Sequence, residues 1–345
     1  MDNLKSKLIY IQQAVARATW KKVWNLSKIQ IQKHFFKSDK SWGYPIILVF
    51  DPSSICNLHC PLCPTGQGRK ERSKGIASFE NFKRIMVEVE DYLFFVQFTN
   101  WGEPIVNKEL TKMIKYSHQK NIETVLRTNL TLANKNICES LINAGLDEII
   151  ISLDGASEKT YLKYRRGGNF PKVIENIKHL VAVERKCRSN IRIIWQFIVS
   201  SQNEYEIPKA RQMSKKLGAE LRVVPLRVDM GNEVTADRTK QIKKDFSWLP
   251  RNEKLSRYNY SKKQNRYFEK TCRWLWTKLV VNWNGSVSPC CAIWEEKFDF
   301  GNAFDEGLMA IWNGYMYQAA RKLVREKKPV KNIICSKCLK NGFVN

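Results

Sequence analysis

The sequence predicts an α/β protein built on a partial (β/α)6 TIM-type barrel, followed by a small cysteine-rich C-terminal domain. Short β-branched or aromatic runs alternate with stretches of helical periodicity, which is typical of a parallel sheet with crossover helices. Six such runs are present, fewer than the eight strands of a closed barrel. Eight of the ten cysteines fall into two groups, one directly after the first run and the other in the last quarter of the chain.

Each element of this fold has a place in the sequence. Strands are expected at 46–51, 94–99, 124–128, 148–154, 191–199 and 220–226, and helices at 78–92, 108–120, 134–145, 170–186 and 204–218. We divide the chain into a basic amphipathic helical segment (1–44), the barrel core (45–228), a charged connector (229–271) and the C-terminal domain (272–345). Chemistry is expected at the C-terminal ends of the strands.

Composition restricts the setting of the protein. The chain has 345 residues, 43% of them hydrophobic, and a net charge of +26. No apolar run is long enough to span a bilayer, and the N-terminus lacks the apolar core of a signal peptide, so we expect a cytoplasmic protein. Clustered cysteines in a reducing compartment indicate metal binding rather than disulfides. The ungrouped Cys138 and Cys187 are expected to be small buried residues of helices.

The stretch CNLHCPLC (56–63) places Cys56, Cys60 and Cys63 just after the first expected strand. A structural zinc site needs four ligands, and iron–sulfur clusters normally have four cysteines. A cluster held by three cysteines leaves one iron open to bind a substrate or cofactor. The missing fourth ligand therefore indicates a functional site.

The C-x3-C-x2-C spacing resembles the radical S-adenosylmethionine (SAM) superfamily. This resemblance implies a 4Fe-4S cluster on the three cysteines, with S-adenosyl-L-methionine bound to the open iron. NWGEP (100–104), at the end of the second strand, resembles the family's Gly-Glu-Pro motif. The resemblance implies that Gly102, Glu103 and Pro104 help to bind SAM, with Glu103 as the anionic acceptor for its amino group.

Other strand ends are similar to pieces of the same family. Asn129 of RTNL (127–130) and Ser152 of ISLDG (151–155) would bond to the ribose or carboxylate of SAM, or they serve ordinary turn chemistry. The resemblance also implies that one arginine of YRRGGNF (164–170) pairs with the methionine carboxylate. Arg165 and Arg166 are both candidates, and a surface salt bridge is the alternative for each. In the fifth strand, the residues expected to contact adenine are Gln196 and Val199.

The stretch from Cys272, with its hairpin glycine, PCC sequence and closing CSKC, resembles the SPASM extension found behind radical SAM barrels. That extension holds auxiliary iron–sulfur clusters. We expect one auxiliary 4Fe-4S cluster on Cys272, Cys290, Cys335 and Cys338, with Cys291 as the alternative to Cys290. A four-cysteine zinc site remains the alternative to the cluster.

The resemblance implies an enzyme that reductively cleaves SAM to a 5'-deoxyadenosyl radical, which abstracts hydrogen from a substrate. A reducing partner such as flavodoxin or ferredoxin would supply the electron. The expected substrate is a peptide or protein side chain, and the alternative is a lipid, isoprenoid or lipid-linked sugar. A third hypothesis is a non-enzymatic iron–sulfur or zinc protein that binds nucleic acid. We regard nucleic acid as an unlikely partner, because a pure binding module does not need an amino-group clamp beside an open iron.

The first 40 residues add a hypothesis about location. Apolar residues recur at helical spacing, basic residues lie beside them and two tryptophans follow. Such a helix can lie on an anionic membrane, here the inner membrane surface, or it can pack against the barrel. The apolar residues are Leu4, Leu8, Ile11 and Val15, the basic ones Lys5, Lys7, Arg17, Lys21 and Lys22, and the tryptophans Trp20 and Trp24.

Overall fold

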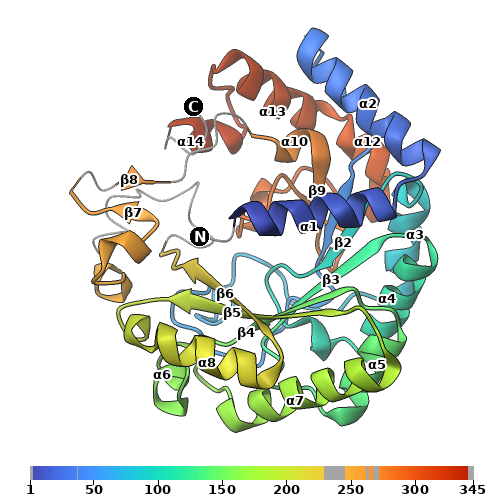
Figure 1. Cartoon of the computed structure of the whole chain (residues 1–345). Coiled ribbons are helices and arrows are strands. Elements are labelled where there is room, and N and C mark those ends of the chain that lie inside the picture. Colours follow the sequence, from blue (N-terminus) through green and yellow to red (C-terminus); the bar gives the residue numbers. More distant parts are fainter. Residues whose placement is uncertain (1–2, 37, 229–244, 262–263, 267–271, 341–345) are drawn as a thin grey trace.

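The computed structural model describes residues 3–36, 38–228, 245–261, 264–266 and 272–340. Eight strands form one sheet in the order β10-β9-β1-β2-β3-β4-β5-β6 (Figure 1). Every neighbouring pair is parallel except β9 and β10, and the two end strands do not close on each other. The sheet is therefore an open, partial barrel, as the sequence predicts.

The first six strands lie where the β-branched and aromatic runs predict them, within two residues at either end. They are β1 (Ile47–Phe50), β2 (Phe95–Phe98), β3 (Glu123–Thr128), β4 (Glu148–Ser152), β5 (Arg192–Val199) and β6 (Glu220–Pro225). A separate two-stranded sheet pairs β7 (Tyr258–Asn259) with β8 (Gln264–Asn265). Parallel strands place their C-terminal ends at one edge, where the cysteine loop follows β1.

Helices cover the outer face of the sheet (Figure 1). They are α3 (Phe79–Val89), α4 (Leu110–Gln119), α5 (Lys135–Asn143), α6 (Glu158–Tyr164), α7 (Phe170–Cys187) and α8 (Ile207–Leu217). In α3, Phe82, Ile85, Met86 and Val89 recur at helical spacing and are buried, and Ser78 caps the first turn. The sequence analysis did not predict α6, the short helix that precedes Arg165.

Each strand has an outer and an inner face, and the two faces pack differently. Outward side chains join the large core beneath the helices, whereas Val125, Ile150 and Ile194 form a small separate cluster. Successive residues of a strand point to opposite faces, so these three mark the inner face of β3, β4 and β5. That alternation decides which polar residues face the barrel interior.

Two N-terminal helices, α1 (Asn3–Ala16) and α2 (Trp20–Phe35), precede the barrel. The Tyr10 hydroxyl of α1 donates to Glu148 Oε1 at 2.9 Å, and Arg17 Nε lies 3.1 Å from Glu123 Oε2. These two carboxylates begin β4 and β3, so α1 packs over the N-terminal ends of these strands. The described part of the helix thus packs against the barrel, as one of the two hypotheses expected.

The predicted basic face of this segment is only partly exposed. Arg17 pairs with barrel carboxylates, and Lys22 is 1% exposed and donates to the Asn121 carbonyl at 2.6 Å. Burial lowers the pKa of Lys22 to about 8. Both cations are therefore unavailable to a membrane, in agreement with the alternative that the helix packs against the barrel. The side chains of Leu4, Lys5 and Lys7 lie outside the described residues.

The C-terminal domain adds strands to the barrel sheet itself. Here β9 (Lys278–Val281) pairs in parallel with β1, and β10 (Val287–Ser288) pairs with β9. Arg72 of the barrel core, 2% exposed, forms a two-pronged ion pair with Asp299 at 2.8 and 2.9 Å. The helices of this domain are α10 (Trp274–Thr277), α11 (Ala303–Glu306), α12 (Leu308–Trp312), α13 (Tyr315–Glu326) and α14 (Cys335–Lys340).

The two ungrouped cysteines differ in burial. Cys138 is completely buried in α5, as predicted. Cys187 is exposed, so its prediction was wrong: it is the last residue of α7, beyond the apolar face that the helix packs on the sheet. Among the described helices, none is long and apolar enough to cross a membrane.

Candidate functional site

The three-cysteine loop follows β1 at the C-terminal edge of the sheet. Cys60 is buried, while Cys56 and Cys63 are partly exposed. A Cβ on Gly66 would lie 2.5 Å from the backbone N and O of Cys60, so only glycine permits this close return of the loop. Burial raises the pKa of the Cys56 thiol to about 12 and also raises that of Cys60. Thiolates in such surroundings require a positive partner, and a set of donors consisting only of sulfur fits an iron–sulfur cluster.

Gly102, Glu103 and Pro104 follow β2 and lie against this loop. A Cβ on Gly102 would lie 1.7 Å from the Ser53 carbonyl oxygen, so the glycine is required by contact with the β1 loop itself. Pro104 begins the short 3-10 helix η1 (Pro104–Val106), which Glu103 caps. The sequence motif therefore has a clear architectural role in the contact between two loops.

The Glu103 carboxylate connects the ends of two strands. It is 2% exposed and accepts from the Thr128 hydroxyl at 2.5 Å, the Asn129 N–H at 2.7 Å and the Ile105 N–H at 3.2 Å. Burial raises the pKa of Glu103, and these hydrogen bonds oppose that effect. Three donors thus hold the two carboxylate oxygens next to the cysteine loop. Thr128, which sequence reasoning missed, is its nearest partner.

Asn129 bridges the end of β3 and the cysteine loop. Its Nδ2 donates to Asn57 Oδ1 at 2.9 Å and lies 3.9 Å from Cys56 Sγ, within the range of a weak hydrogen bond to sulfur. Its Oδ1 accepts from the Thr131 N–H at 2.9 Å, which is the turn chemistry weighed above. Ser152 ends β4 and is half-buried. Asn129 therefore both closes a turn and contacts the cysteine loop.

The structure separates the two candidate arginines. Arg165 Nη1 lies 3.7 Å from Cys60 Sγ, and its Nε donates to Asp154 Oδ2 at 2.6 Å. The Arg166 side chain is exposed, and its carbonyl accepts from the His59 N–H at 2.9 Å. Asp154, for which the sequence analysis proposes no site role, is 1% exposed and orients Arg165. Of these two arginines, only Arg165 therefore brings a cation to the cysteines.

Gln196 and Val199 do not come together. They are three residues apart on β5, so strand alternation places them on opposite faces of the sheet. Val199 is 1% exposed within the outer core, whereas Gln196 Oε1 accepts from Arg127 Nη1 at 3.3 Å. Of the two, only Gln196 faces the barrel interior.

Four cysteines of the C-terminal group line one apolar pocket, and they are Cys272, Cys290, Cys335 and Cys338. Burial raises the pKa of the Cys290 and Cys335 thiols well above the usual range. Cys291 lines a different cavity, in the barrel. The side chains of Cys290 and Cys291 thus diverge. The four thiols that line the apolar pocket fit an iron–sulfur cluster. Within the described ranges, no group of three or more His, Cys, Asp or Glu side chains is arranged to hold a single metal ion.

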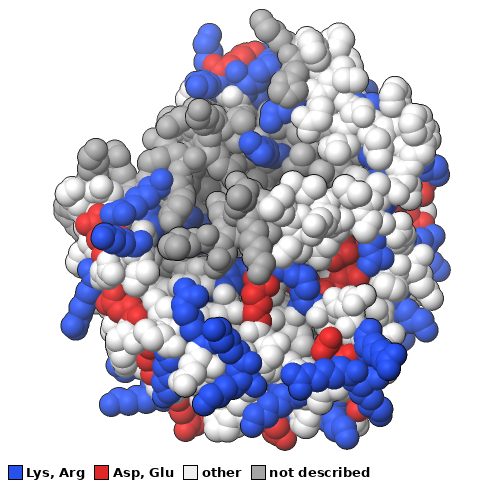
Figure 2. Space-filling view, viewed as in Figure 1, with Lys and Arg blue, Asp and Glu red and all other residues white. Residues whose placement is uncertain are grey.

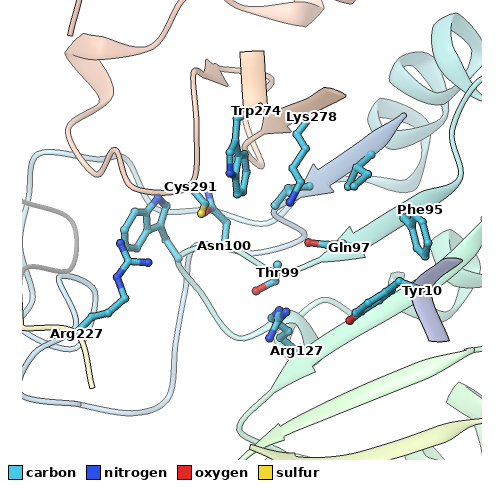
Figure 3. Close-up of a pocket in the computed structure, with 13 residues that line it drawn as sticks. Tyr10, Phe95, Gln97, Thr99, Asn100, Arg127, Arg227, Trp274, Lys278 and Cys291 are labelled. Carbon is cyan, nitrogen blue, oxygen red and sulfur yellow. The ribbon is translucent and has the colours of Figure 1, made fainter. Parts of the chain in front are cut away.

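A cavity of about 610 Å³ opens inside the barrel, between the inner faces of β1, β2 and β3 and the start of β9 (Figure 3). Three cations, Arg127, Arg227 and Lys278, are among the residues that line it. Sequence reasoning did not find these residues, although the alternation of TVLRT in β3 would have placed Arg127 inward. The lining residues are Tyr10, Ile47, Val49, Phe95, Gln97, Thr99, Asn100, Trp101, Arg127, Arg227, Trp274, Lys278 and Cys291.

Comparisons with known proteins agree with this geometry. Residues 51–194 match the model of the radical SAM superfamily, and residues 272–339 match SPASM, an iron–sulfur cluster-binding domain. The chain therefore contains a radical SAM domain followed by a C-terminal SPASM domain. These domains imply a 4Fe-4S cluster and SAM in the barrel, and auxiliary iron–sulfur in the C-terminal domain.

Individual relatives are distant. The AdoMet-dependent heme synthase of Methanosarcina barkeri is 27% identical over 51% of this chain and 48% of its own length. Mycofactocin maturase MftC of Mycobacterium tuberculosis is 25% identical over 59% of this chain and 52% of its own. The chain thus spans about half the length of these two relatives. The crystal structure of SuiB of Streptococcus suis bound to SAM has the same fold, with a TM-score of 0.62, 19% identity and coverage of 91% of this chain and 73% of SuiB.

Proposed function

We propose that this protein reductively cleaves SAM and uses the resulting 5'-deoxyadenosyl radical to abstract hydrogen from a substrate. The proposal depends on one observation: the three thiols meet the Glu103 network and the Arg165–Asp154 pair at a single edge of the sheet. The 4Fe-4S cluster, when bound to Cys56, Cys60 and Cys63, supplies the electron transfer to SAM.

The surrounding residues have distinct proposed roles. Glu103 accepts the SAM ammonium, and Arg165 pairs with its carboxylate. Asn129 and Ser152 offer hydrogen bonds to the ribose or carboxylate of SAM. Gln196, which faces the barrel interior from β5, contacts the adenine. Gly102 and Pro104 set the loop that holds Glu103.

We further propose that residues 272–345 bind one auxiliary 4Fe-4S cluster through Cys272, Cys290, Cys335 and Cys338. Their common pocket favours Cys290 over Cys291. A flavodoxin or ferredoxin supplies electrons in the cytoplasm, where free cysteines persist.

For the substrate, we propose a peptide or protein side chain. Two relatives support this class: one is named as the maturase of mycofactocin, and SuiB was solved bound to its precursor peptide SuiA. The radical chemistry itself does not depend on this choice.

A lipid, isoprenoid or lipid-linked sugar at an anionic membrane is the second candidate, and one surface favours it. On α1 and α2, large apolar side chains are exposed, among them Leu8 (52%), Val15 (69%), Trp20 (77%) and Trp24 (50%). Figure 2 shows the region over these helices as largely uncharged, whereas Lys and Arg crowd the lower part of the view. We name the surface formed by Leu8, Ile11, Val15, Trp20, Val23, Trp24, Ile31 and Phe35 the apolar band.

The test is anaerobic reconstitution followed by measurement of 5'-deoxyadenosine with and without dithionite. We expect dithionite-dependent 5'-deoxyadenosine from the wild-type chain and none from the triple variant with Cys56, Cys60 and Cys63 replaced by alanine. Retention of cleavage in that variant would refute the proposal. Nucleic-acid binding without cleavage would instead support the third hypothesis.

A further inference from the structure

Three cations line the barrel cavity. Arg127 of β3, Arg227 after β6 and Lys278 of β9 are among its lining residues, and none of the described lining residues is Asp or Glu. Figure 3 shows the three side chains coming from different walls of the cavity. A volume of about 610 Å³ falls within the range of small-molecule sites. The interior therefore has the size and the charge to receive an anionic group.

Arg127 lacks a carboxylate partner among the described residues. Its guanidinium donates to Gln196 Oε1 at 3.3 Å and forms no ion pair there. The carboxylate of Glu148 is already matched, because it lies 2.6 Å from Arg192 Nη1 and accepts from the Tyr10 hydroxyl. Burial lowers the pKa of Arg127, so its charge is costly in this position. An anion in the cavity would remove that cost.

Arg222 adds a second observation on the adjacent strand. It is the register partner of Gln196 on β6, and its charge also lowers the pKa of Arg127, so the two guanidinium groups repel. Arg222 Nε and Nη2 are buried without a hydrogen-bond partner in the described part of the chain. Arg222 does not itself line the cavity, so its effect is to add repulsion at Arg127. An oxyanion beside Arg127 would offset that repulsion, since the forked donors of a guanidinium match its geometry.

We propose that the barrel cavity binds an oxyanion group of the substrate, a carboxylate or a phosphate, with Arg127 as the central partner and Arg227 and Lys278 on the facing walls. Calling this ligand the substrate depends on the proposed function, whereas anion binding itself does not. The site thus restricts the substrate to molecules that carry such a group.

The test is isothermal titration calorimetry on the anaerobically reconstituted full chain at fixed salt, with inorganic phosphate and with succinate as probes. The variants are Arg127→Met, Arg127→Lys and, as matched control, Arg211→Met on the exposed surface of α8. We expect at least one probe to bind wild type and Arg211→Met equally. Arg127→Met should weaken that probe tenfold or more, and Arg127→Lys less. The probe that binds distinguishes a phosphate from a carboxylate ligand.

Equal binding by all variants would indicate general attraction to a basic surface and overturn the proposal, as would no binding to wild type. If Arg127→Met melts at a clearly lower temperature than wild type, Lys278→Met on the opposite wall replaces it. A tenfold or greater loss of probe affinity in Lys278→Met then supports the proposal, and wild-type affinity overturns it. SAM affinity, measured by equilibrium dialysis, should stay unchanged in Lys278→Met, which is used here because Arg127 also donates to Gln196 of the proposed SAM site. A parallel loss would mean that SAM is the anion and would overturn the substrate assignment. Because 5'-deoxyadenosine is assayed separately, failure of the anion site and failure of SAM cleavage give different results.

Discussion

Arg165 and Asp154 form an ion pair beneath the cysteine loop, with 2.6 Å between Nη2 and Oδ2. Asp154 is 1% exposed and also accepts from the Ile198 N–H at 2.7 Å. The pair connects the end of β4 to the residue that follows α6, and it holds the guanidinium 3.7 Å from Cys60 Sγ through Nη1. The position of the cation at the cysteines thus depends on a carboxylate that does not itself contact them.

Replacing that carboxylate tests its structural role. Asp154→Asn leaves a largely buried guanidinium without its anion, so the free energy of unfolding should fall by about 3–5 kcal/mol, as for other broken buried pairs. Denaturant titration under anaerobic conditions measures this. Asp91→Asn removes the surface partner of Lys21 and should leave stability unchanged. Similar stability for both variants would show that the Arg165–Asp154 pair is not energetically important.

Glu103→Gln tests the proposed ammonium contact. The amide keeps the shape but loses the negative charge, and hydrogen bonds to charged groups are worth about 1.5–3 kcal/mol. SAM affinity should therefore fall roughly tenfold or more, while iron content stays at the wild-type level. Equilibrium dialysis with labelled SAM measures the change, with the exposed Glu80→Gln as control. Wild-type affinity in Glu103→Gln would mean that the carboxylate only joins β2 to β3.

Variants of Cys290 and Cys291 should differ in iron content. Wild type should hold about eight irons after reconstitution, from two four-iron clusters. Cys290→Ser should reduce this to about four, because Cys290 shares the pocket of Cys272, Cys335 and Cys338. Cys291→Ser should retain all eight, since that thiol faces the barrel cavity. Iron and sulfide assays decide, and the reverse pattern would assign the ligand to Cys291.

The apolar band predicts binding to lipid vesicles, because exposed apolar side chains can enter the membrane interface. Trp20 and Trp24 stack at 6.1 Å between ring centroids and are exposed, so replacing both with Gln should reduce cosedimentation several-fold without affecting SAM cleavage. Tyr315→Gln, an equally exposed aromatic residue on α13, is the control. If neither wild type nor control sediments with vesicles, the membrane-surface hypothesis fails, and the peptide substrate is favoured.

The local sequence pattern was enough to predict the strands, but it could not predict the direction of individual side chains at the site. The runs of β-branched residues mark β1 to β6 because each strand buries one face under helices. In contrast, YRRGG cannot reveal that Arg165 turns inward and Arg166 outward, since this depends on how α6 ends. The same holds for Cys290 and Cys291, which diverge into separate cavities. Cys187 was misassigned because helical pattern at the last turn does not determine burial.

The cations of the cavity illustrate a second limit. Arg127 sits at an inward position of a strand that the sequence identifies, so its direction could have been derived from alternation. Lys278 and Arg227 reach the same space only because distant segments meet there. Their convergence is a property of tertiary structure and has no signature in local sequence.

The parallel pairing of β9 with β1 limits how the SPASM domain can be exchanged between related proteins. The strand that begins six residues after Cys272 is a neighbour of the strand that leads into the three-cysteine loop. A chimera that joins residues 51–194 of this chain to the SPASM region of another protein would remove the outer partner of β1. It would leave a row of unpaired backbone groups beside the three-cysteine loop. Grafts that respect this fold must therefore carry 278–288 with the barrel. The SPASM domain therefore cannot be exchanged as an independent unit. Strands β9 and β10, which form one edge of the barrel sheet, have to be exchanged with it.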